Sequence, residues 1–413
     1  MTTAPRPDYD FIIIGARCAG AATARLLARA GARVLVLERG TLGSDTLSTS
    51  FLMRSAVLQL QRWDVLSRLI EAGTPPVSTT HFHYASRTVS VAMGEPLYAP
   101  RRTLLDPLLV VAAREAGAEV LFGERVTGLV RRFDGRVRGV EVEQGHAVRR
   151  SITAHMVIGA DGLPSSMARW VEAETYRVGS YSEPAIYGYF EGLPVDAYHW
   201  YYAHGMGAGA AATNDGLTTV FVGGPPHRMP ELHGDRQAGM LRIAAELSPS
   251  FGEALASARR VGALRAFPGA RGYYRRPWGA GWALVGDAGY FRDPNTAHGI
   301  SDALRDAELL ADALIAGGEL SLAHYHARRD AATERLFHAS DELAGGRWDE
   351  PRVEELLRTA SEGMRESQRV VESFDRRADL DQPAARTSSP LHSVSIGVPV
   401  SRFATRTDSR SGV

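Results

Sequence analysis

The chain has 413 residues with 47 basic and 47 acidic side chains, so its formal net charge at pH 7 is zero. It therefore lacks the basic excess that favours binding to nucleic acid or to an anionic membrane. All 47 basic side chains are arginine, which excludes mechanisms that need a catalytic lysine. The single cysteine, Cys18, excludes an internal disulfide and a cysteine-rich zinc site, and we predict no metal site.

The N-terminus and the length bound the class of protein. The first residues, M-T-T-A-P-R-P-D, contain no apolar core of the kind found in secretion signals. No later apolar run approaches the roughly 20 residues of a membrane-spanning helix. We therefore expect a cytoplasmic protein that binds neither nucleic acid nor a membrane. Its length corresponds to two or three domain-sized units, and the sequence leaves its oligomeric state open.

The N-terminal segment has the pattern of a strand–helix–strand unit. Tyr9 to Ile14 is a short apolar run, typical of a buried parallel strand. The alanine-rich stretch from Ala19 to Ala30 predicts a helix, with Gly31 at its C-terminal end. A second apolar run, Arg33 to Leu37, predicts the next strand, and Glu38 follows it.

The connection between this strand and helix, I-G-A-R-C-A-G, resembles a dinucleotide-binding loop. Gly15 permits a tight turn, and Gly20 permits close packing of the helix on the sheet. Arg17 replaces the expected middle glycine, and its guanidinium could contact a pyrophosphate. Glu38 is placed to accept hydrogen bonds from ribose hydroxyls. The cofactor-binding residues predicted from this segment are Gly15, Arg17, Cys18, Ala19, Gly20, Glu38 and Arg39.

Helix and strand signals alternate through the next part of the chain. Asp106 and Pro107 are predicted to open a helix, because proline is favoured at the first helical position. Alternating residues from Glu119 to Glu143 predict strands, with a hairpin turn at Phe133-Asp134-Gly135-Arg136. Met156 to Ala160 predicts a further buried strand.

The character of the sequence changes in the second half. Residues Tyr176 to Phe267 are rich in aromatics and alternate, which predicts antiparallel strands. After Trp278 the segment G-W-A-L-V-G-D predicts another buried strand, and a helical pattern runs from about Ser301 to Ala316. Beyond Gly346 the chain is charged and helical, and from about Asp381 its composition predicts a loose tail.

Two long segments carry a resemblance to a known family. G-A-D-G-L-P-S-S-M-A-R resembles the Asp-Gly motif, and L-V-G-D-A-G-Y-F-R-D-P-N-T-A-H-G-I resembles the Gly-Asp motif, of the para-hydroxybenzoate hydroxylase family of single-component (group A) flavin monooxygenases. R-R-T-L-L-D-P-L-L resembles the Arg-x-x-Leu element of the same family, with Arg102 as the equivalent arginine. These motifs occur in family order between about Asp8 and Leu314.

The resemblance implies FAD as cofactor, with NADH or NADPH as a transient reductant. It places Asp287 on the ribityl chain, Arg102 near the phosphates and ribityl, and the turn from Pro294 to Gly299 before a helix directed at the flavin pyrimidine. Asp293 is expected in an exposed part of that turn. The cofactor-binding residues that the resemblance adds are Arg102, Asp161, Gly286, Asp287, Pro294, Ala297, Gly299 and Ile300.

The expected fold class is α/β, with a Rossmann-like FAD-binding domain of the glutathione-reductase type. An antiparallel β-sheet substrate domain is inserted into it, and a helical region follows. The predicted boundaries are 1–175 for the first FAD-binding part, with 75–100 contributing to the substrate domain, then 176–268 for the substrate domain, 269–345 for the return of the FAD-binding domain, and 346–413 for the helical segment and tail.

The family reaction implies a small-molecule substrate, either aromatic or polyketide-like. NAD(P)H reduces the flavin, oxygen adds to it at C4a, and the hydroperoxide hydroxylates an electron-rich ring. A general base would assist with a phenol, and His81, His83 and His204 are candidates. Each of these histidines can equally be a surface or structural residue. The aromatics Tyr187, Tyr189, Trp200 and Tyr202 fit either a sheet core or a substrate pocket.

Other reactions share these motifs. An FAD-dependent reductase of the geranylgeranyl reductase type is the alternative to a monooxygenase. A halogenase is disfavoured, because the related halogenases use a lysine and a W-x-W-x-I-P motif that this sequence lacks. A flavoprotein without catalytic activity is the remaining possibility. The sequence does not specify the substrate, because pocket residues vary freely on one scaffold.

Overall fold

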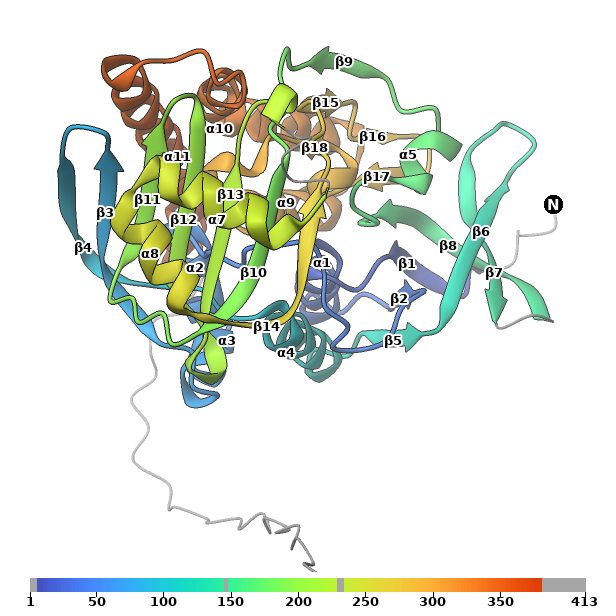
Figure 1. The fold of residues 1–413 in the computed structure, drawn as a ribbon. Coiled ribbons are helices and arrows are strands. Elements are labelled where there is room, and N and C mark those ends of the chain that lie inside the picture. Colours follow the sequence, from blue (N-terminus) through green and yellow to red (C-terminus); the bar gives the residue numbers. More distant parts are fainter. Residues whose placement is uncertain (1–5, 145–147, 229–233, 381–413) are drawn as a thin grey trace, which may run out of the picture. The chain divides into compact units, whose positions relative to one another are not determined.

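The computed structural model describes residues 6–144, 148–228 and 234–380 (Figure 1). Residues up to Phe374 form one compact unit. Residues from Asp375 form a second unit, of which the structure describes only the last residues of helix α11. The loose tail predicted from Asp381 lies outside the described residues. Within the described ranges, no helix is both long and apolar enough to span a membrane.

The first sheet has eight strands and carries the predicted strand–helix–strand unit. Its main path is β16-β17-β8-β1-β2-β5, and β7 and β6 extend from β8 as an antiparallel hairpin. The central pairs β8–β1, β1–β2 and β2–β5 are parallel. The strands are β1 (Tyr9–Ile14), β2 (Val34–Glu38), β5 (Glu119–Phe122), β6 (Glu124–Arg131), β7 (Val137–Gln144), β8 (Val148–Gly159), β16 (Trp278–Gly279) and β17 (Trp282–Leu284).

Three helices pack together beside this sheet. α1 contacts both α4 and α9, and these contacts join the N-terminal unit to the segment after the Gly-Asp motif. Their apolar side chains share one core with the strand residues Ile13 and Val36. Two shorter helices, α2 and α3, also contribute to that core. The helices are α1 (Cys18–Arg29), α2 (Arg54–Arg62), α3 (Val65–Glu71), α4 (Arg102–Glu115) and α9 (Gly299–Ala316).

A second sheet of seven strands has the order β14-β10-β13-β12-β11-β3-β4. Its pairs are antiparallel except β11–β3, where a strand from early in the chain lies parallel to one from the middle. Figure 1 shows these two strands, coloured blue and green, side by side. The strands are β3 (Pro76–Tyr84), β4 (Thr88–Tyr98), β10 (Ala185–Glu191), β11 (Tyr198–Ala203), β12 (Met206–Ala212), β13 (Thr218–Gly223) and β14 (Arg259–Phe267).

The two faces of the second sheet have different neighbours. One face packs against the core of the FAD-binding part through side chains such as Tyr198 and Trp200. The other face is covered in part by α7 and α8, whose apolar residues pack on Ile186 and Val220 (Figure 1). The remaining described elements are α5 (Ser166–Trp170), β9 (Thr175–Val178), α7 (Arg236–Leu247), α8 (Pro249–Ser257), β15 (Tyr273–Arg275), β18 (Tyr290–Phe291), α10 (Glu319–Ala344) and α11 (Glu350–Leu380).

The expected fold class is confirmed, with a parallel sheet, a separate largely antiparallel sheet and C-terminal helices. Two details of the sequence prediction are wrong. Pro107 does not open α4 but lies inside it, because the helix begins at Arg102. The segment predicted as strands also contains α7 and α8. Asp235 caps α7 and Ser248 caps α8, each accepting a hydrogen bond from a first-turn amide.

The contact between α1 and the strand end leaves no room for a side chain at Gly20. A Cβ on Gly20 would lie 1.9 Å from the carbonyl oxygen of Gly15. Gly15 itself has a φ of 104°, which favours glycine. The structure therefore explains why both loop positions are glycine: one makes the turn and the other lets the helix approach.

We expect Gly20→Ala to lower the free energy of unfolding by about 1–3 kcal/mol, the usual cost of overpacking. The variant should also bind FAD more weakly, because α1 must move away from the strand ends. Chemical denaturation and flavin titration measure the two effects. Gly94→Ala is the matched control, since a Cβ at that exposed β4 position meets nothing within 4 Å. Equal stability of the two variants would contradict this account.

Candidate functional site

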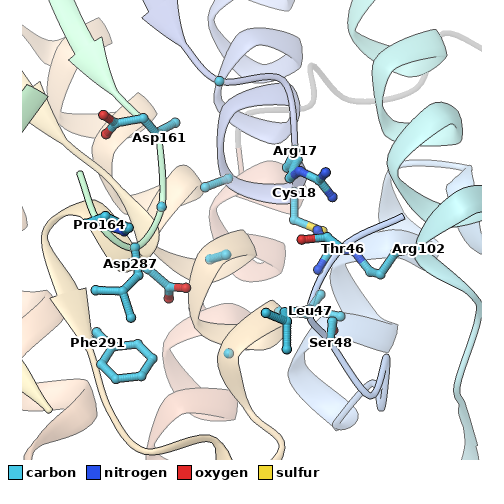
Figure 2. A pocket seen from close by; sticks show the side chains of 18 of the residues that line it. Arg17, Cys18, Thr46, Leu47, Ser48, Arg102, Asp161, Pro164, Asp287 and Phe291 are labelled. Atoms are coloured by element: carbon cyan, nitrogen blue, oxygen red, sulfur yellow. The ribbon is translucent and has the colours of Figure 1, made fainter. Parts of the chain in front are cut away.

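A cavity of about 810 Å³ lies where the first sheet, α9 and the second sheet meet. This volume is in the upper part of the range typical of small-molecule and cofactor sites. Figure 2 shows Asp287 and Phe291 on one side of the cavity, with Arg17, Cys18 and Arg102 on the other. Of the predicted cofactor residues, those that line it are Gly15, Arg17, Cys18, Ala19, Glu38, Arg39, Arg102, Asp161, Asp287, Pro294, Ala297, Gly299 and Ile300.

The loop between β1 and α1 forms one end of the cavity. The helix begins at Cys18, so the amides of its first turn lack intrahelical partners and favour an anion at this point. The Glu38 carboxylate accepts hydrogen bonds from the backbone amides of Ala16, at 3.0 Å, and Gly40, at 2.8 Å. Glu38 therefore holds the loop after β1 and the loop after β2 in place, and its side chain also lines the cavity.

Arg17 and Arg102 converge on one buried carboxylate. Arg102 donates two hydrogen bonds to Asp106, at 2.9 and 3.0 Å, and Arg17 donates a third at 3.2 Å. The Cys18 thiol donates to the same carboxylate at 3.2 Å, and burial raises the pKa of this thiol. Two guanidinium groups thus share one carboxylate beside the N-terminus of α1, which leaves this corner positively charged and suited to a pyrophosphate.

Asp161 holds the loop that follows β8. Its carboxylate accepts hydrogen bonds from the Ser165 hydroxyl at 2.6 Å and from the amides of Ser166 and Met167 at 2.7 and 3.0 Å. Asp161 therefore acts as a capping group for α5 while lining the cavity. The Asp-Gly motif shapes the cavity wall through this short helix.

Asp287 lies in the short turn Gly286–Ala288 that follows β17, and it points into the cavity (Figure 2). Burial raises its pKa to about 6, and the charge of Asp302 adds to this rise, whereas Arg102 and Arg292 oppose it. Gly286 does not line the cavity. It has a φ of 61°, and a Cβ there would lie 3.0 Å from that of Ala19, so this glycine lets the Gly-Asp turn pack on α1.

The turn from Pro294 leads into the N-terminus of α9. Ala297 lines the cavity in the left-handed region, with a φ of 50°. Gly299 and Ile300 open the helix at the cavity wall, so first-turn amides without intrahelical partners lie there. The buried Ser301 hydroxyl has no hydrogen-bond partner in the part of the chain described. The first-turn amides suit the electron-rich edge of a flavin ring, whereas Ser301 is not part of the cavity wall.

A buried ionic network supports this turn from behind. Asp302 pairs with Arg292 at 2.8 Å and with Arg305 at 2.6 Å, and both guanidinium groups hold the pKa of its carboxyl well below its usual range. His298 is also buried and lies 3.1 Å from Asp302, and burial lowers the pKa of this histidine. The network holds the start of α9 in place, because loss of any one of these ion pairs would leave a buried charge without a partner.

Sequence reasoning missed a pair of carboxyl groups in the cavity wall, Glu183 and Asp293. The backbone amide of Glu183 donates to Asp293 at 2.6 Å. Burial raises the pKa of Asp293 to about 7, and burial together with the charge of Asp293 raises that of Glu183 well above its usual range. The expectation that Asp293 is exposed is wrong: its side chain is buried and accepts hydrogen bonds from the backbone amides of Glu183 and Asn295. No pattern in the sequence joins these residues, which come from separate loops.

The three candidate histidines lie away from the cavity. His81 and His83 lie on β3, and both contact His199 on the neighbouring strand β11. All three side chains are on one face of the second sheet, and Trp200 is on the other face. Burial and the neighbouring histidines lower the pKa of His83 to about 4. His204 lies exposed in the turn between β11 and β12. None of the three lines the cavity, so none is placed to deprotonate a substrate held there.

The aromatic residues divide between the two roles considered from the sequence. Tyr187 lines the cavity, and its hydroxyl donates to the Thr46 carbonyl at 2.6 Å. Trp200 and Tyr202 belong to the core between the sheet and the FAD-binding part. Tyr189 is buried beside Tyr187, under the guanidinium of Arg101. The cavity residues that the sequence did not indicate include Phe221, Phe267 and Phe291.

Comparison with known proteins identifies the cofactor. A family model described as an FAD binding domain matches residues 8–340. The chain belongs to this family. The resemblance to the para-hydroxybenzoate hydroxylase type of flavoprotein is thereby confirmed, and the family supports FAD as the cofactor. The cavity fits FAD, since it offers an anion-binding helix end, an acidic residue at the end of β2 and unpaired donors at the start of α9.

Relatives in the family differ in function. Protein FixC of Escherichia coli O157:H7 is 34% identical over 172 residues, which is 39% of this chain and 38% of FixC. The chain thus spans well under half the length of this relative. Digeranylgeranylglycerophospholipid reductase 1 of Methanococcoides burtonii is 27% identical over 312 residues, or 74% of each chain.

Solved structures with the same fold include both oxygenating and halogenating enzymes. The flavin-dependent brominase Bmp2 superposes with a TM-score of 0.75 at 17% identity, covering 91% of this chain and 100% of Bmp2. PqsL, a probable FAD-dependent monooxygenase from Pseudomonas aeruginosa, superposes with a TM-score of 0.71 at 22% identity, covering 84% of this chain and 99% of PqsL. At these identities the similarity establishes the fold alone.

We expect Asp287→Ala to raise the FAD dissociation constant about ten- to a hundred-fold, because a hydrogen bond to a charged group is worth about 1.5–3 kcal/mol. Flavin fluorescence titration at about pH 8, where the carboxyl is ionised, measures the change. Asp134→Ala in the exposed β6–β7 turn is the matched control and should bind FAD as the wild type does. An unchanged affinity in Asp287→Ala would remove this residue from the FAD site.

The Glu183–Asp293 pair predicts a pH-dependent stability. Both carboxyl groups have a higher pKa in the folded state than in the unfolded chain, so protonation favours folding. This contribution to the free energy of unfolding is complete below the ordinary carboxyl pKa, and it is lost as the pH rises through the folded-state pKa values, of which that of Asp293 is about 7. Between about pH 5 and pH 9, the free energy of unfolding of Glu183→Gln should therefore fall less than that of the wild type. Denaturation of the FAD-loaded proteins tests this. The exposed variant Glu95→Gln should follow the wild type, and parallel curves for all three would refute the coupling.

Proposed function

We propose that this protein is an NAD(P)H- and O2-dependent monooxygenase that hydroxylates an aromatic or polyketide-like small molecule. The observation that carries the proposal is the composition of the cavity between the FAD-binding loops and the second sheet. Its wall there combines Tyr187, Phe221, Phe267 and Phe291 with the carboxyl groups of Glu183 and Asp293. Aromatic walls with a few polar groups are typical of sites for flat ring ligands.

The aromatic part of the cavity adjoins the predicted flavin end. Phe291 and Asp287 are separated by only a few residues, and both line the cavity (Figure 2). Ala297, in the turn just before α9, lines it as well. A ring held against Phe291 and Phe267 would therefore lie next to the redox centre. These apolar side chains would also exclude water, which protects a reactive oxygenating group from breakdown.

Bound FAD supplies the redox chemistry, by accepting a hydride and activating oxygen. The residues of this chain would bind and orient the substrate and handle its protons. With a pKa of about 7, Asp293 can exchange a proton near neutral pH, and the protonated Glu183 can donate a hydrogen bond to a phenol or carbonyl oxygen. The carboxyl pair therefore replaces the histidines as the acid–base candidate.

A reductase acting on an alkene is the second candidate. It is supported by the match to digeranylgeranylglycerophospholipid reductase 1 over 74% of both chains. Such a reaction needs an electron donor and a proton source but no oxygen, and the carboxyl pair suits it as a proton source. The aromatic wall favours a ring over an extended isoprenoid chain, which is why we place the monooxygenase first.

The two functions predict opposite responses to oxygen. We expect the FAD-loaded protein, given NADPH or NADH and a panel of phenolic compounds under isotopically labelled O2, to yield a product that contains one labelled oxygen atom. Mass spectrometry detects that atom, and the product should be absent under argon. Free FAD with the same reductant is the control for non-enzymatic oxidation. A product that gains two hydrogen atoms equally well under argon would establish the reductase instead.

A further inference from the structure

Three histidines and one aspartate gather on the face of the second sheet that points away from the cavity. His81 and His83 lie on β3, and His199 lies on the neighbouring strand β11, directly opposite His81 in the parallel register. Asp196 lies in the loop before β11. Within the described ranges, ligand atoms of His81, Asp196 and His199 all lie within 4.8 Å of one another. None of the four residues has a role in the proposed function.

The hydrogen bonds around the three rings can all form when each imidazole is neutral and carries one hydrogen. His81 Nδ1 lies 2.8 Å from Ser90 Oγ, and His83 Nδ1 lies 2.9 Å from Thr88 Oγ1. His199 Nδ1 lies 3.0 Å from His83 Nε2. All three bonds form when every Nδ1 donates its hydrogen. That arrangement leaves a lone pair on Nε2 of both His81 and His199.

The resulting lone pair on His199 is unused by the protein. Its Nε2 is buried, has no hydrogen-bond partner among the described residues and lies 3.7 Å from Asp196 Oδ1. A buried nitrogen without a partner is costly, and this one faces a carboxylate with an exposed side chain. One ring nitrogen of His81, one of His199 and a carboxylate oxygen of Asp196 thus lie within 4.8 Å of one another.

We propose that His81, His199 and Asp196 form a binding site for a divalent transition-metal ion, with Zn²⁺ the ion that the donor set favours. Two histidines and one carboxylate are a common zinc ligand set, and water completes a tetrahedron on the solvent side. Harder cations such as Mg²⁺ prefer oxygen ligands and fit this site less well. The sequence predicted no metal site because these ligands come from separate segments that only the β3–β11 pairing brings together.

The surroundings of the rings also match those of metal-binding histidines. Metal ligands usually donate their second ring N–H to an acceptor, which fixes the ring and its tautomer. Ser90 would do this for His81, and His83 would do it for His199. Tyr201 stacks on His83 with ring centroids 4.3 Å apart, so the rings are also held by packing. Asp196 needs the largest adjustment to reach bonding distance, and its exposed side chain can make it.

The bound ion would link β3 to β11, the parallel pair of strands in the second sheet. β3 and β4 lie at the end of the sheet, and β3 reaches its neighbour β11 from a distant part of the chain. An ion shared by His81 on β3, His199 on β11 and Asp196 in the preceding loop would tie these segments together. The site lies apart from the FAD cavity, because none of its three ligands lines that cavity.

Metal titration of the tag-free, FAD-loaded protein tests the proposal. After treatment with EDTA, calorimetry with ZnCl2 should give one ion bound per chain. His81→Ala and His199→Ala should each weaken binding at least tenfold, whereas His324→Ala, on the exposed side of α10, should leave it unchanged. Zn²⁺ should raise the melting temperature of the wild type and of His324→Ala only. MgCl2 should not compete.

Two positioning variants separate this site from adventitious binding by surface histidines. Ser90→Ala and His83→Ala remove the partners of the two ligand rings, and each should weaken Zn²⁺ binding about ten- to a hundred-fold. Co²⁺ should give a visible band typical of tetrahedral coordination that disappears in His199→Ala. The proposal is overturned if the wild type binds no Zn²⁺, or if binding and thermal stabilisation survive in both His81→Ala and His199→Ala.

Discussion

The close approach of α1 to the strand ends of the first sheet is the constraint on which the rest of this structure depends. Gly20 lies against the carbonyl oxygen of Gly15, and Gly286 packs against α1 from the other side. These two contacts bring the N-terminus of α1 and the Gly-Asp turn to the same end of the sheet. A side chain at either glycine would push apart elements that form different parts of the cavity wall. The cofactor site is thus built by backbone packing before any polar side chain contributes.

Buried ion pairs then fix the loops that this packing brings together. Asp106 collects hydrogen bonds from Arg102 and Arg17 on one side of the cavity. Asp302 binds Arg292 and Arg305 behind the other side. Burying charges is costly unless they are paired, so each arrangement tolerates little movement of its members. Such pairs add modestly to stability, but they hold the cavity in one shape before a ligand arrives.

The seven-stranded sheet supplies two chemically different surfaces. Because side chains alternate along a strand, neighbours on β11 point to opposite faces. Trp200 packs toward the FAD-binding part, whereas His199 and Tyr201 face away from it. The same alternation on β13 sends Phe221 to the cavity. One sheet can therefore border a substrate pocket on one face and hold a histidine cluster on the other.

Much of the cavity lining could be predicted from sequence because the motifs that form it are local. The loop from Gly15 to Gly20 and the Gly-Asp turn at Asp287 each place their groups through a few adjacent residues, so short patterns carry the geometry. The prediction of Pro107 as a helix start failed for a related reason. Proline at a first turn is a statistical preference, and the packing of α4 on α1 overrode it by extending the helix back to Arg102.

The carboxyl pair and the histidine cluster were decided by tertiary structure alone. Glu183, in the loop before β10, meets Asp293, in the turn before α9, and His81 meets His199 because β3 pairs with β11. No local pattern marks such residues, since their spacing in the chain is arbitrary. The sequence by itself determined the fold class through local turns and hydrophobic periodicity, and it indicated the family and the cofactor through motifs that resemble those of known flavoproteins. Only the tertiary structure decided which titratable side chains face the cavity, because burial and proximity of distant segments set both their positions and their pKa values.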